Sequence, residues 1–74
     1  MKELKVGQVV EFFRPVDADG TMIPKGARAR VAHIIAELPE PKVVLVLLGE
    51  KPEALLVERH EVTVNSIPVA AALD

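Results

Sequence analysis

The sequence predicts a mainly β fold, a small five-stranded barrel, from three observations. Apolar residues gather in runs of strand length, turn-forming Pro and Gly separate these runs, and one run is apolar at every position. Short strands between regularly spaced turn signals are typical of small barrels. One alternative stays open, an α+β fold in which residues 27–38 are helical.

The length and composition of the chain indicate one domain. Its 74 residues lie near the lower size limit for folding alone, 50% of them are hydrophobic, and none is cysteine. Without disulfides or thiolate metal sites, the packing of apolar side chains must supply the stability. We expect residues 1–65 to form the barrel domain and residues 66–74 to form an apolar C-terminal tail.

The first predicted strand covers residues 6–14, where apolar residues alternate imperfectly with polar or small ones until Pro15 stops the strand. For residues 16–26 we expect loops and turns. This stretch contains Asp17, Asp19 and two glycines, and these residue types satisfy or permit the backbone conformations of turns.

Residues 27–38 carry two conflicting patterns. The spacing of a helical face is shown by Val31, Ile34, Ile35 and Leu38, and strand alternation by Ala27, Arg28, Ala29, Arg30 and Val31. We favour the strand, with a bulge near His33 that shifts the register. The preceding Pro24-Lys25-Gly26 resembles a loop between strands more than a helix cap.

The apolar run at residues 43–48, between Pro41 and Gly49, predicts a strand that is buried on both faces. A domain this small has difficulty burying both faces, so one face fills the interior and the other lies at an interface. The two possible faces are Val43, Leu45 and Leu47, or Val44, Val46 and Leu48. As the candidate interface we take Val43, Leu45, Leu47, Ile67 and Val69.

Three short elements complete the prediction. Residues 54–57 read as a strand, residues 58–61 as one helical or 3₁₀ turn, and residues 62–64 as the last strand.

The turn and core residues of this pattern match those of a known group. They are Gly7, Val10, Phe12, Phe13, Arg14 and Pro15, then Gly26, Ala29 and Val31, then Pro41, and finally Val57, Glu61, Val62 and Val64. Over residues 6–64 the chain resembles the SH3-like barrels, and among them the electron-transport accessory group. That group includes the variable chain of ferredoxin–thioredoxin reductase and the small stromal subunit of photosystem I. The resemblance implies an SH3-like barrel and a non-catalytic chain that docks onto a larger assembly.

The sequence contains no motif for catalysis, cofactor binding or metal binding. The one serine, Ser66, lies in the predicted tail, and no nucleophile motif or phosphate-binding loop is present. The sequence after Asp17-x-Asp19-Gly20 lacks the later ligands of a calcium loop, and His33 and His60 without cysteine are too few for a zinc site. We therefore predict that the protein is not an enzyme and has no cofactor.

The charges argue against binding to nucleic acid. Nine Lys and Arg against eleven Asp and Glu give a net charge of -2, and only two aromatic residues could stack on bases. No apolar run is long enough to span a bilayer, and the first eight residues show no signal-peptide pattern, so we expect a cytoplasmic protein without membrane contact. The cluster Lys25, Arg28 and Arg30 is the candidate contact for an acidic partner.

Together these features predict a non-catalytic protein–protein interaction module that acts as an accessory subunit or as a homo-oligomer. The alternative is a small oligomeric ligand-binding or catalytic barrel whose site forms between chains.

Overall fold

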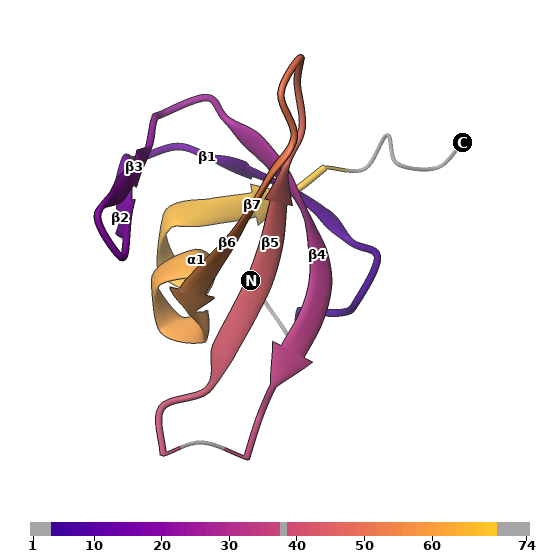
Figure 1. Ribbon diagram of the computed structural model, residues 1–74, viewed down its shortest axis with the longest axis vertical. Coiled ribbons are helices and arrows are strands. Elements are labelled where there is room, and N and C mark those ends of the chain that lie inside the picture. Colours follow the sequence, from indigo (N-terminus) through magenta and orange to yellow (C-terminus); the bar gives the residue numbers. More distant parts are fainter. Residues whose placement is uncertain (1–3, 38, 70–74) are drawn as a thin grey trace.

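The computed structural model describes residues 4–37 and 39–69, and it confirms a mainly β chain (Figure 1). The elements in chain order are β1 (Val9–Phe12), β2 (Val16–Ala18), β3 (Thr21–Ile23), β4 (Arg28–Ile35), β5 (Lys42–Leu47), β6 (Glu53–Glu58), α1 (Arg59–Asn65) and β7 (Ser66–Pro68). Five strands form an antiparallel sheet in the order β6-β5-β4-β1-β7, and β2 pairs with β3 in a separate hairpin. The predicted closed barrel is not observed, because β6 and β7 stand at opposite edges of an open sheet.

The strand β4 corrects the helical alternative, because residues 28–35 are extended. Leu38, the last residue of the helical spacing, lies outside the described residues. The register of β4 with β5 shifts between Val31 and His33, so a β-bulge lies where the sequence predicts one. Ala29 and Val31 are buried on the inner side before the bulge, and Ile34 packs against the core after it. The bulge changes the spacing of inward-facing residues from two to three, and this is why the stretch resembles a helical face in sequence.

Residues 16–23, expected to be a loop, form the β2–β3 hairpin instead. Asp19 and Gly20 have φ angles of 54° and 93°, as in the two-residue type I′ turn that joins tightly paired strands. The Asp17 Oδ1 atom accepts a hydrogen bond of 2.9 Å from the Gly20 backbone N–H. An Asp-Gly pair between short apolar stretches is a hairpin signal, so this element was predictable.

We expect the Gly20→Val variant to be less stable to unfolding by about 1–2 kcal/mol, because a β-branched residue is strained at positive φ. A Cβ atom at Gly20 would have no neighbour within 4 Å, so the backbone alone accounts for the cost. Urea denaturation measures the change, and Gly20→Asn is the control because Asn tolerates this conformation. Equal losses for the two variants would contradict the assignment of the turn.

The end of the chain differs most from the prediction. Residues 62–64, predicted as the last strand, lie in α1, and the last strand is β7, which pairs antiparallel with β1. The predicted domain boundary at residue 65 therefore falls between α1 and β7, and residues 66–68 extend the sheet instead of starting a separate tail. Residues 70–74 of the predicted tail lie outside the described residues.

Side-chain hydrogen bonds stabilise the C-terminal end of α1. The Asn65 Nδ2 atom donates to the Glu61 backbone oxygen at 2.8 Å, and the Ser66 Oγ atom donates to the Val62 backbone oxygen at 2.6 Å. Both residues are buried, so these bonds satisfy polar groups that would otherwise be costly to bury. This accounts for Ser66 as a structural residue.

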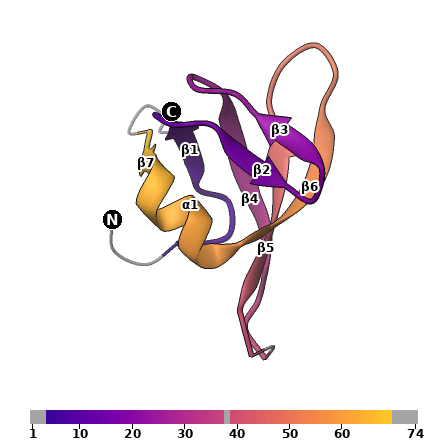
Figure 2. The same ribbon diagram turned by 90° about the vertical axis from the view of Figure 1, so that its left-hand side faces the viewer.

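A single core joins the inner side of the sheet, the β2–β3 hairpin and α1. The hairpin and α1 both contact β6 (Figure 2). The largest fully buried apolar side chains are Phe12, Ile23, Leu45, Val10, Val31, Val43 and Val62. Within the described part of the chain, no helix has the length and apolar character needed to cross a membrane.

Candidate docking surface

The strand β5 uses its two faces differently. Val43 and Leu45 are fully buried, and Leu47 packs against the same core. Their assignment to the candidate interface is therefore corrected, because inward-facing side chains cannot meet a partner of the folded chain. The outward-facing residues are Val44, Val46 and Leu48, of which the first two are half-buried and Leu48 is 42% exposed.

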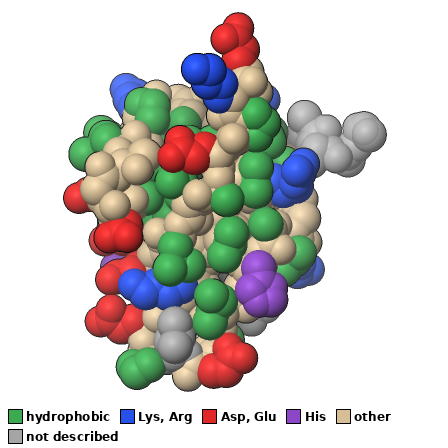
Figure 3. All heavy atoms as spheres, viewed as in Figure 1, with side chains coloured by type: hydrophobic (Ala, Val, Ile, Leu, Met, Phe, Trp, Pro, Cys, Tyr) green, Lys and Arg blue, Asp and Glu red, His purple; other side chains and the backbone are tan. Residues whose placement is uncertain are grey.

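The outward-facing residues of β5 continue onto its neighbour β6. Val44 pairs with Leu56 and Val46 pairs with Ala54 across this hairpin, and Leu56 is 46% exposed. The outer apolar face is the set Val44, Val46, Leu48, Ala54 and Leu56. Figure 3 shows hydrophobic side chains running along this side of the molecule. Sequence reasoning missed the two residues of β6, although the turn after Leu48 could have indicated the pairing.

Two ion pairs lie at the margins of this face. The Lys42 Nζ atom is 3.9 Å from Glu58 Oε2, and the Arg28 Nε atom is 3.1 Å from Glu11 Oε1. Both pairs are partly exposed to solvent, so they contribute little to the free energy of folding. Their effect is to set the charge around the apolar centre.

The predicted contact for an acidic partner is only partly continuous. Arg28 and Arg30 alternate with buried Ala29 on β4, so both side chains lie on the outer side of the sheet. Lys25 is exposed in the turn between β3 and β4. The structure thus places the two arginines next to the outer apolar face, which the sequence did not indicate.

Ile67 and Val69, also predicted at the interface, lie elsewhere. Ile67 is 54% exposed on β7, and the Val69 backbone N–H donates to the Val9 backbone oxygen at 2.9 Å. Because β7 and β6 are at opposite edges of the sheet, these residues do not cover the outer side of β5. They are not part of the outer apolar face.

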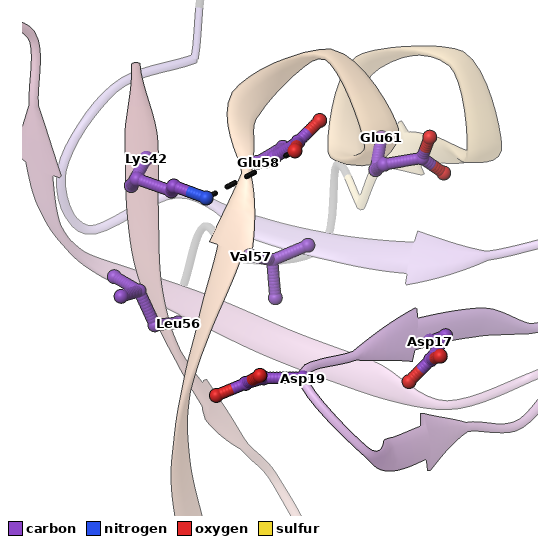
Figure 4. Close-up of a pocket in the computed structure, with 7 residues that line it drawn as sticks. All are labelled: Asp17, Asp19, Lys42, Leu56, Val57, Glu58 and Glu61. Atoms are coloured by element: carbon purple, nitrogen blue, oxygen red, sulfur yellow. Dashed lines mark ion pairs between the residues drawn. The ribbon is translucent and has the colours of Figure 1, made fainter. Parts of the chain in front are cut away.

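A groove of about 490 Å³ lies beside β6, between the β2–β3 hairpin and α1 (Figure 4). Its lining residues are Asp17, Asp19, Lys42, Leu56, Val57, Glu58 and Glu61. Asp17 is engaged in the hairpin turn and Glu58 in the ion pair with Lys42. Among the described residues, no three His, Asp or Glu side chains are grouped so that they could hold a metal ion.

The histidines lie apart. His33 is exposed on the outer side of β4, opposite Val44. His60 is exposed in the first turn of α1.

No protein-family model, curated protein or solved structure matches the chain. Any functional assignment therefore rests on the residues described above.

Proposed function

We propose that the protein is a non-catalytic protein–protein interaction module that docks through the outer apolar face, either as an accessory subunit or as a homo-oligomer. The observation that carries this proposal is the apolar, solvent-facing side of the β5–β6 hairpin. Strands that face water on one side normally carry polar residues there. Neighbouring apolar side chains at such positions are typical of protein interfaces.

The free energy that a partner could gain from this face is suitable for reversible docking. A partner that covers about 200 Å² of apolar surface gains about 5 kcal/mol, and the loss of translational and rotational freedom offsets part of this gain. Additional contacts around the apolar centre are therefore needed for a stable complex.

We also propose that the fold, although its sheet is open, is related to the SH3-like barrels of the electron-transport accessory group. Support comes from the order of the elements, in which five main strands are interrupted by a hairpin after the first and by a helical turn before the last. Members of that group dock onto larger assemblies, which agrees with the proposed function.

We expect the Val46→Lys variant to keep its fold but lose its association with other proteins, because a charge at the centre of an apolar interface must be desolvated. Association is measured in two ways: light scattering of the purified chain at high concentration, and affinity capture from native extract followed by mass spectrometry. Circular dichroism checks that the variant is folded.

The matched control is Met22→Lys, which places the same charge at a residue that is 58% exposed on β3, outside the outer apolar face. Ile67→Lys tests the opposite edge of the sheet separately. We expect both variants to associate as the original chain does. If Val46→Lys associates as strongly as Met22→Lys, the outer apolar face is not the docking surface.

A further inference from the structure

The outer apolar face has a basic margin on one side only. Arg28 and Arg30 of β4 lie on its outer side, beside the outward-facing residues of β5. On the other side, β6 contributes Glu58, whose carboxylate faces Lys42. The face is therefore apolar in the middle and basic along β4. Along β6 the charges of Glu58 and Lys42 offset each other.

Of the two arginines on β4, Arg30 is the one available to a partner. The register places Arg30 directly opposite Val46, at the centre of the outer apolar face. Its neighbour Arg28 is held by Glu11, whereas Arg30 has no ion-pair partner among residues 4–37 and 39–69. A partner that buries Val46 must also bring its surface close to this guanidinium, and it gains most by placing a carboxylate there.

A helix can occupy this face and a strand cannot do so equally well. A strand needs backbone partners and obtains them at a sheet edge, whereas a helix satisfies its own backbone groups and can lie on a sheet face. The outward-facing residues from Val44 to Leu48 span about 13 Å of extended chain. A helix of about nine residues has the same length.

A second copy of the chain is a poor occupant. Its one helix among the described residues, α1, is short and turns Val62 into its own core. Two copies packed by their outer apolar faces would also bring two unpaired Arg30 charges to the interface, and Glu58 is already paired with Lys42. The seven-residue α1 is shorter than the face and is committed to its own core, so a different protein is the better source of the helix.

We infer that the partner presents an amphipathic helix whose apolar stripe lies along β5 and whose acidic flank lies over β4, with a carboxylate at Arg30. This inference rests on the proposed docking function and adds the chemistry of the partner.

The test uses the full chain and three synthetic peptides of about 18 residues, a length at which helices begin to form in water. The first peptide has a leucine stripe with glutamates on one flank, the second replaces these glutamates by lysines, and the third replaces the leucines by serines. Titration followed by amide chemical shifts in NMR gives the dissociation constant and the residues affected. We expect the first peptide to bind most tightly, with the largest shifts at Arg30, Val44, Val46 and Leu56. The lysine peptide should bind about tenfold more weakly, and the serine peptide should not bind.

Two variants with the same change of charge test the role of Arg30. We expect Arg30→Glu to weaken binding of the glutamate peptide about tenfold and to strengthen binding of the lysine peptide. Lys51→Glu, in the exposed turn between β5 and β6, should change either affinity by less than about twofold, because solvent screens a distant charge.

Several results would overturn the inference. They are no binding of the glutamate peptide at about 1 mM, equal binding of the lysine peptide, equal effects of the two variants, or retention by phosphatidylserine vesicles or RNA in place of the peptide. If Val46→Lys abolishes association in extract while Arg30→Glu leaves peptide binding unchanged, docking stands and the acidic helix is wrong. If Val46→Lys changes nothing in extract, both proposals fail.

Discussion

The Leu45→Ala variant is expected to lose about 3 kcal/mol of unfolding free energy, because the substitution removes a fully buried side chain and leaves a cavity in the core. A domain of this size has a total stability of about 5 kcal/mol, so the variant should retain only about 2 kcal/mol at room temperature. Urea denaturation followed by circular dichroism measures the loss.

Leu48→Ala is the matched control for this effect. It makes the same change three residues later on the same stretch of chain, but at a side chain that is 42% exposed on the outer side. We expect a loss below about 1 kcal/mol, since less apolar surface leaves a buried environment. A larger loss for Leu48→Ala than for Leu45→Ala would mean that the two faces of β5 are assigned the wrong way round.

The Val62→Asp variant is expected to lose more than about 3 kcal/mol and to unfold α1 and β7, because an unpaired carboxylate would be placed in the core. Val62 is fully buried, and the helix it belongs to connects β6 to β7. Amide hydrogen exchange of residues 59–68, together with the melting temperature, measures the effect.

The comparison with Val64→Asp distinguishes a helix from a strand in this segment. In a strand, residues 62 and 64 would share one face and respond alike. In α1 they point in different directions, and Val64 is 41% exposed. We expect Val64→Asp to cost less than about 0.5 kcal/mol, and similar large losses for both variants would favour the strand.

The strands that the sequence placed approximately are those bordered by clear turn signals. Pro15 follows the first strand, Pro and Gly border the all-apolar run, and a charged turn precedes β6. The bulge near His33 was also predicted, because the arginine alternation and the helical spacing can be reconciled by one extra residue.

The segment at residues 62–64 was predicted wrongly because its residues favour strands by local propensity. In the structure, burial of Val62 and the hydrogen bonds of Asn65 and Ser66 at the end of α1 outweigh that preference. Propensity differences are smaller than the free energy of burying one such side chain, so packing decides.

The all-apolar run of residues 43–48 shows how far sequence and tertiary structure each determine this protein. The sequence by itself determined that this run is a strand and that its face turned away from the core has no polar residues to contact water. Only the tertiary structure decided which face that is, because a run without alternation does not distinguish its two faces. The register of β4, β5 and β6 then placed Arg30 and Leu56, distant in sequence, on the two sides of the outward-facing residues of β5.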